Sequence, residues 1–277
     1  MTEYCKTCRG MIILGSVIIA VMALSLWLRA VDAQPPGTEL KERAKKAEVI
    51  IDHTGNKNIS GYVYLCYADG SHMRAPSEIG RGLINLAGAM RRWTKIDTKI
   101  DDRISLSSSS IMNMPFIYVG YDGRFDLTEA EQNNLRKYLE NGGFLVLENL
   151  EPVMSQKLAS SPFKSVFQSF TGPHGRIEPL PKNHSIYHCF FDFSDGPPLG
   201  SVTRDTAPGR QDVENMDDPH IPKYLEGITI GGRLVAVCST KRYVEKWKDN
   251  ANNEPQLKMG VNMIVFALTQ EGGITLR

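Results

Sequence analysis

Residues 116–147 have the sequence FIYVGYDGRFDLTEAEQNNLRKYLENGGFLVL, and this stretch decides the fold. Residues 116–119 and 144–147 are short apolar runs of the kind that form buried strands. Between them, Thr128 and Glu131 have the spacing of a capping box, which starts a helix. A strand, a helix and a strand with short connections predict two parallel neighbouring strands, because the crossover returns the chain beside its start.

The alternation of strands and helices continues on both sides of this stretch. Residues 62–67 and 95–100 are predicted strands, and the helix between them is expected to bury Leu83, Leu86, Ala87 and Met90. Further along the chain, residues 225–239 are predicted to form a hairpin around Gly231 and Gly232, and residues 259–268 a buried closing helix. The pattern is that of an α/β fold.

Composition excludes several classes of protein. The 277 residues carry a formal net charge of +1 and no basic stripe with interleaved aromatic residues, so nucleic acid is not an expected partner. Five cysteines are too few and too scattered for a disulfide framework. Cys66 and Cys238 lie inside apolar runs, which predicts buried free thiols. Cys5 and Cys8 form a single CxxC pair without the second pair that a zinc site needs.

The N-terminal part contains a hydrophobic segment. Residues 11–28 carry no charge and are just long enough to span a bilayer as a helix. Two interpretations remain open: an uncleaved single-pass membrane anchor, or an export signal that is removed. Lys6 and Arg9 favour a cytoplasmic start, and Arg29 weakens the cleavage site. Either interpretation places the body of the chain outside the cytoplasm.

Three regions follow from this pattern. Residues 1–33 are the predicted signal or transmembrane segment, and residues 34–60 a linker with a charged helix over residues 38–51. Residues 61–270 are the predicted α/β domain.

Several separated motifs resemble one family. Residues 115–128, 135–145, 180–188, 225–234 and 260–268 are similar, in this order, to the DUF4159 family of unknown function. The resemblance implies the class I glutamine amidotransferase-like superfamily, with a flavodoxin-like doubly wound, mostly parallel sheet. It also implies an N-terminal transmembrane or signal helix, which members of the family often carry.

An active class I amidotransferase places a cysteine on a glycine-lined elbow after a central strand, with a histidine and a glutamate supplied later. The comparable strand end here is LENL at residues 147–150, which has no cysteine. Cys189 directly follows His188, but neighbours in an extended segment point to opposite faces. Pro181 and the aromatic residues after His188 predict such an extended segment. We therefore expect no catalytic residues of this type.

The candidate ligand-binding residues are polar groups and glycines at predicted strand ends. Three acidic groups at one sheet edge could bind a sugar, a cation or a polar peptide, or could instead cap helices and satisfy loop amides. His184 matches a recurring histidine of the family, and Arg233 could pair with a carboxylate. The full candidate set is Asp69, Gly120, Asp122, Gly123, Glu148, His184 and Arg233.

The predicted function is a non-catalytic binding or scaffold domain of the cell envelope, held at the membrane by residues 11–28 and bound to a protein partner there. No cofactor and no metal are expected. The alternative is a hydrolase or carbohydrate-processing protein that uses acidic residues at the carboxyl edge of the sheet.

Overall fold

The computed structural model describes residues 46–52, 58–73, 75–101, 103–122, 125–150, 167, 175–201 and 223–274. The chain divides into two units, Met1–Glu42 and Arg43–Arg277, and every described residue belongs to the second unit. None of the helices in this described part combines the length and the apolar character that a membrane span needs. The hydrophobic segment 11–28 lies outside the described residues.

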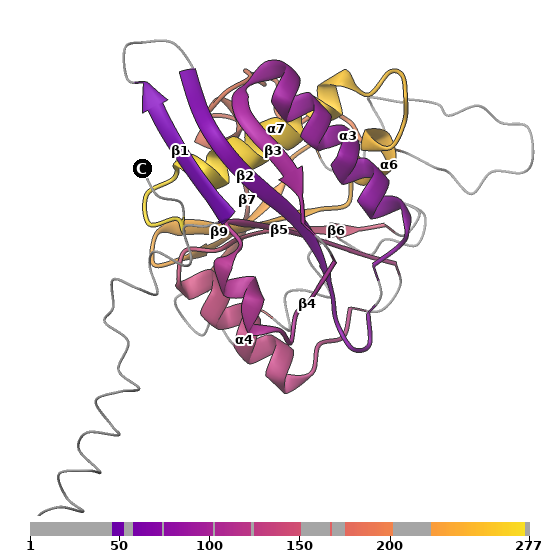
Figure 1. The fold of residues 1–277 in the computed structure, drawn as a ribbon, viewed down its shortest axis with the longest axis vertical. Coiled ribbons are helices and arrows are strands. Elements are labelled where there is room, and N and C mark those ends of the chain that lie inside the picture. Colours follow the sequence, from indigo (N-terminus) through magenta and orange to yellow (C-terminus); the bar gives the residue numbers. More distant parts are fainter. Residues whose placement is uncertain are drawn as a thin grey trace, which may run out of the picture. The chain divides into compact units, whose positions relative to one another are not determined.

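The core of the domain is a nine-stranded mixed sheet (Figure 1). The strand order is β1-β2-β5-β6-β9-β8-β7, and β3 and β4 also pair with β2. The pairs that join β2, β3, β4, β5, β6 and β9 are parallel, whereas β1, β7 and β8 pair antiparallel. The predicted α/β class with a mostly parallel sheet is therefore confirmed. The strands are β1 (Ala47–Asp52), β2 (Asn58–Asp69), β3 (Lys95–Ile100), β4 (Ile104–Ser105), β5 (Phe116–Tyr121), β6 (Phe144–Asn149), β7 (Gly175–Pro179), β8 (Glu226–Ile230) and β9 (Arg233–Ser239).

Helices cover both faces of the sheet (Figure 1). Helices α3 (Glu78–Trp93), α6 (Tyr243–Trp247) and α7 (Glu254–Thr269) pack on one face, where Tyr118 joins their apolar cluster. Helix α4 (Glu129–Glu140) packs on the other face with Ile117 and Val119. Every residue of β5 and β6 is buried, because both faces of these central strands are covered.

The predicted capping box starts α4 and also ties down a distant loop. Thr128 accepts a hydrogen bond from the Glu131 amide, and one Glu131 oxygen accepts from the Thr128 amide and hydroxyl at 2.8 and 2.9 Å. The other oxygen accepts from the amide and hydroxyl of Ser71, which follows β2. Burial acts to raise the pKa of Glu131, but these hydrogen bonds outweigh it and lower the pKa below its usual range.

The tight connection from α4 to β6 depends on two glycines. Gly142 has a φ of +100°, which an L side chain rarely adopts. A Cβ on Gly143 would lie 2.3 Å from the ring of Tyr138. The Tyr138 hydroxyl donates to the Phe144 carbonyl at 2.8 Å and accepts from the Phe144 amide at 3.0 Å, so it fixes the first residue of β6.

The helix predicted over residues 38–51 is wrong where the structure describes it. The charged helix expected over residues 38–51 is replaced at its C-terminal end by strand β1, which pairs antiparallel with β2. Residues 38–45 lie outside the described residues. Ala47 and Val49 are buried whereas Glu48 and Ile50 are exposed, and this alternation of period two fits an edge strand. The sheet therefore includes residues before the predicted domain boundary at residue 61.

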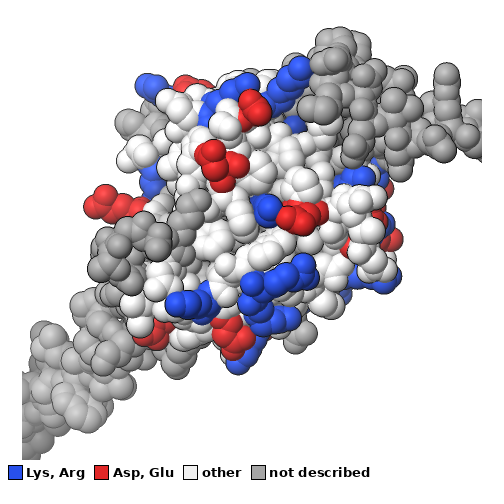
Figure 2. Space-filling model, turned by 90° about the horizontal axis from the view of Figure 1, so that it is seen from above, with Lys and Arg blue, Asp and Glu red and all other residues white. Residues whose placement is uncertain are grey.

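Charges of both signs occur on the face that Figure 2 shows. Lysine and arginine side chains are interspersed there with aspartate and glutamate, with uncharged surface between them. The described part of this face carries no continuous basic surface of the kind that follows a phosphate backbone.

Two described glycines, one buried in β5 and one on a partly exposed position of α3, should respond to alanine with opposite signs. A Cβ on Gly120 would lie 2.8 Å from Ile79 Cδ1 and 3.0 Å from Leu150 Cδ1, so we expect Gly120→Ala to lower the free energy of unfolding by about 1–3 kcal/mol. A Cβ on Gly88, within α3, would meet nothing within 4 Å, so Gly88→Ala should raise it by up to about 1 kcal/mol. Urea denaturation measures both changes, and equal stability of the two variants would contradict this packing.

Candidate functional site

The carboxyl edge of the parallel strands is the usual ligand site of an open α/β sheet. At this edge β6 places Glu148 between β5 and β9, opposite Gly120 and Ser239 in the strand register. Glu148 is completely buried, so its position is interior rather than a rim facing solvent.

Both carboxylate oxygens of Glu148 are engaged. One oxygen accepts from the Ser239 hydroxyl at 2.9 Å. The other accepts from the Tyr118 hydroxyl at 2.6 Å and from the backbone amide of Val244 at 3.0 Å. Val244 lies in the first turn of α6, so this carboxylate joins two strands and the start of a helix.

The groups around Glu148 have perturbed acidity. Burial raises the pKa of Glu148 above its usual range despite these hydrogen bonds. Burial and the neighbouring Glu148 carboxylate raise the pKa of Tyr118. Burial lowers the pKa of Lys241 to about 8, although Glu148 acts against this shift. Shifted groups often mark active sites, but a general base must reach its substrate, and Glu148 exposes no surface.

The other predicted acids at this edge do not converge on Glu148. Asp69 forms an ion pair with Arg103, with 3.5 Å between Asp69 Oδ2 and Arg103 Nη1. Asp122 is exposed to solvent. Gly120 provides space for the packing of Ile79 against the sheet. Gly123 lies outside the described residues.

The described part of the chain contains three free thiols. Cys66 and Cys238 are buried and unbridged as predicted, and burial raises the pKa of both. The Cys189 thiol donates to the Asn262 carbonyl at 3.2 Å. His188 instead contacts the Asp192 carboxylate and the Lys182 carbonyl through its two ring nitrogens.

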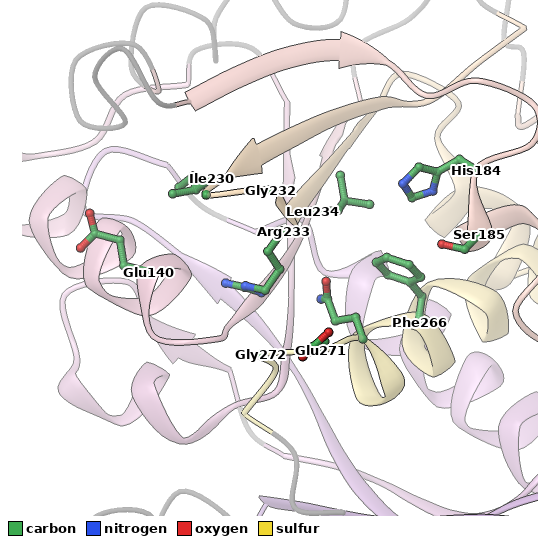
Figure 3. Close-up of a pocket in the computed structure, with 12 residues that line it drawn as sticks. Glu140, His184, Ser185, Ile230, Gly232, Arg233, Leu234, Phe266, Glu271 and Gly272 are labelled. Atoms are coloured by element: carbon green, nitrogen blue, oxygen red, sulfur yellow. The ribbon is translucent and has the colours of Figure 1, made fainter. Parts of the chain in front are cut away.

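A pocket of about 740 Å³ opens at the opposite, amino edge of the sheet (Figure 3). Strand β9 begins there, and α4 and α7 end there, because both helices run back along the parallel strands. Two predicted residues, His184 and Arg233, line this pocket. The structure therefore separates the candidate set between the two edges of the sheet.

His184 forms one wall of this pocket, with its imidazole beside the ring of Phe266 at a centroid distance of 5.7 Å. The extended segment predicted here is wrong, because residues Ser185–Tyr187 form a short 3-10 helix, η5. The His184 Nδ1 accepts from the Ile186 amide at 3.2 Å and caps this helix. In the neutral ring the proton consequently sits on Nε2. Burial lowers the pKa of His184, which favours this neutral form.

Arg233 follows the Gly231-Gly232 turn, where both glycines have positive φ and close the predicted β8–β9 hairpin. Its guanidinium donates to the Gly143 carbonyl at 3.1 Å and to the Leu139 carbonyl. Leu139 lies in the last turn of α4, where carbonyls lack regular helical partners, and Gly143 lies in the connection from α4 to β6. Arg233 thus caps α4, and burial lowers its pKa.

The sequence matches one known protein family. Residues 63–268 match the family described as Domain of unknown function (DUF4159). The chain belongs to this family. No curated protein matches it.

Sequence reasoning missed several pocket residues of this DUF4159 domain. Glu140 is the last residue of α4, Glu271 follows the end of α7, and Phe266 comes from the buried face of α7. No local motif marks them. Only the predicted topology could have indicated these residues. A helix that follows a parallel strand returns to the amino edge of the sheet, where β9 also begins, so the ends of α4 and α7 are expected there.

The buried carboxyl of the DUF4159 domain should make stability depend on pH. Because its pKa in the folded state is raised above the ordinary 4.5, Glu148 favours folding below that value, and this contribution is lost as pH rises through the raised pKa. The free energy of unfolding of the wild type minus that of Glu148→Gln should therefore fall as pH rises above 4.5, by at most about 1.4 kcal/mol per pH unit.

Urea denaturation between pH 4.5 and pH 8 measures this difference. Glu178→Gln, which removes an exposed carboxylate of β7, is the matched control and should show no such fall. A difference for Glu148→Gln that stays constant or grows with pH would contradict the interpretation.

Proposed function

We propose that this domain is a non-catalytic binding module of the cell envelope, held at the membrane or exported through residues 11–28, with a protein as its partner. The observation that carries the proposal is the state of Glu148. This carboxylate occupies the end of the central strand, and its oxygens are used by Tyr118, Ser239 and Val244. In an active class I amidotransferase, the comparable strand end would hold the nucleophilic cysteine. In this domain the strand end is buried in the core.

The finer fold assignment belongs to the same proposal. Numbered along the chain, the five parallel strands β3-β2-β5-β6-β9 follow the spatial order 2-1-3-4-5 that is typical of flavodoxin-like sheets. This order supports a degenerate class I glutamine amidotransferase-like domain. The elbow cysteine of that superfamily has no counterpart at residues 147–150.

We assign binding of the protein partner to the pocket at the amino edge of the sheet. The pocket there falls within the volume range of ordinary small-molecule and side-chain sites. Its walls are preformed, because the 3-10 helix η5, the β8–β9 hairpin and the ends of α4 and α7 fix them. The alternative hydrolase gains no support from Asp69 or Asp122, since one is paired with Arg103 and the other faces solvent.

Affinity purification from detergent-solubilised membranes tests the proposal with the full chain. Ser185 lines the pocket and is exposed, so Ser185→Trp should fill the pocket without disturbing the core. Ser109→Trp adds the same side chain at an exposed residue of η2 (Ser109–Asn113), outside the pocket lining. We expect a defined partner to be retained by the wild type and by Ser109→Trp, and to be reduced at least tenfold with Ser185→Trp.

An enzyme assay tests the same proposal from the other side. Purified protein should show no glutaminase or glycosidase turnover above the buffer rate. Turnover that Cys189→Ala or Asp69→Asn abolishes would overturn the non-catalytic assignment.

A further inference from the structure

The ring of His188 contacts an acceptor at each of its two nitrogens. Its Nδ1 contacts the Asp192 carboxylate, and its Nε2 lies 2.8 Å from the Lys182 carbonyl oxygen. A carboxylate and a carbonyl oxygen only accept hydrogen bonds, whereas a neutral imidazole carries a proton on one nitrogen alone. Both contacts are therefore hydrogen bonds only when the ring carries two protons and a positive charge.

The other histidine of this segment is in the opposite state. The His184 Nδ1 accepts from the Ile186 amide, and burial lowers the pKa of this ring, so His184 is favoured as neutral. The difference comes from the partners, because an amide donor favours a neutral ring and a carboxylate favours a charged one. Two histidines four residues apart should consequently lose their protons at different pH.

Charged groups of α7 lie near the carboxylate partner of His188. Asp192 lines a pocket of about 450 Å³ together with Glu254 and Lys258. These two side chains form an ion pair with each other, with 2.7 Å between Lys258 Nζ and Glu254 Oε1, so their charges largely offset one another. On the segment itself the Cys189 thiol is protonated, since it donates to a backbone carbonyl of α7. The charge that contacts the His188 ring is that of Asp192.

The two bonds of His188 close a loop around the 3-10 helix η5. Lys182 precedes this helix and Asp192 follows it, so the ring joins the two ends of segment 182–192. His184 and Ser185 lie between Lys182 and His188 in the chain and form a wall of the amino-edge pocket (Figure 3). The protonation state of one ring is thereby connected to the order of the pocket wall.

The middle of this segment is attached to α7 independently of His188. The side-chain amide of Asn262 donates to the Ile186 and Phe191 carbonyls at 3.0 and 2.8 Å, and its oxygen accepts from the Phe191 amide at 2.8 Å. Beyond this attachment, the Phe193 amide donates to the Tyr187 carbonyl at 3.0 Å across the closed loop. The ends of the segment are therefore the parts that depend on the His188 ring.

We propose that His188 is a pH-sensitive clasp, which closes segment 182–192 around η5 while its ring is protonated and frees one end of the segment when the ring loses a proton. A neutral ring can donate to only one of its two acceptors, so one bond is lost. The stabilisation is present below the ordinary histidine pKa of about 6.5 and is lost as pH rises through the higher value of the folded state. The clasp operates whether or not the pocket binds a protein partner.

NMR titration of the full-length protein in detergent, with histidine labelled with ¹³C at Cε1, follows the ring directly. The chain has six histidines, so His184→Gln and His188→Gln assign the two signals. We expect the His188 signal to titrate with a midpoint above about 6.5 and the His184 signal with a midpoint below it. A His188 midpoint at or below that of His184 would overturn the inference.

Hydrogen–deuterium exchange of the Phe193 amide measures the opening of the segment. In the wild type, its protection, corrected for the intrinsic effect of pH, should fall about threefold to tenfold as pH rises through the His188 midpoint. Asp192→Asn should abolish this fall, because an asparagine amide can donate to Nδ1 of a neutral ring while Nε2 still donates to the Lys182 carbonyl.

A matched control separates the clasp from a general effect of charge. Asp195 is also exposed and lies in the same stretch of chain, so Asp195→Asn removes an equal charge and should behave like the wild type. The clasp is refuted if the Phe193 amide shows the same pH dependence in the wild type and in Asp192→Asn, or if Asp195→Asn abolishes the fall as Asp192→Asn does.

Discussion

A carboxylate deprived of water must have its oxygens satisfied, and Glu148 imposes this requirement at the centre of the sheet. Its carboxylate accepts hydrogen bonds from the Tyr118 hydroxyl of β5, the Ser239 hydroxyl of β9 and the Val244 amide of α6. An unpaired charge there would cost several kcal/mol, so these elements are held in one arrangement. The helical layer above the strand ends is consequently attached by polar bonds as well as by apolar packing.

Because Glu148 is buried and hydrogen-bonded at the carboxyl edge, it is not accessible to a ligand there. In most open α/β sheets the loops after the parallel strands surround the ligand. Here a pocket of about 740 Å³ lies where α4 and α7 end and β9 begins, lined by His184, Arg233 and two acidic side chains. Arg233 lines this pocket, but its guanidinium is held by the Gly143 and Leu139 carbonyls, so its role in the described structure is to fix the end of α4.

The sequence predicted those elements whose signals are local. The capping-box spacing of Thr128 and Glu131 predicted the start of α4, and Gly231 and Gly232 predicted the turn of the β8–β9 hairpin. Strand β1 was missed because its charged composition suggested a helix, and only pairing with β2 makes its alternation meaningful. The short helix η5 depends on a bond from the Ile186 amide to the His184 ring, which no spacing rule encodes.

The candidate site was predictable only in part, for the same reason. Glu148 was among the predicted ligand-binding candidates, but its partners Tyr118 and Ser239 are 30 and 91 residues away in the chain. A sequence pattern cannot tell whether a strand-end acid faces a ligand or the interior. Similarly, Arg233 was expected to meet a carboxylate, whereas it meets backbone carbonyls that are exposed only once α4 has ended.

The bond from the Val244 amide to Glu148 has a consequence for local motion. This amide is buried, and its acceptor lies in the middle of the sheet rather than in the same helix. Because Val244 belongs to α6, its amide loses this acceptor only when α6 moves away from the sheet. Exchange of its hydrogen with deuterium therefore reports the detachment of this five-residue helix from Glu148.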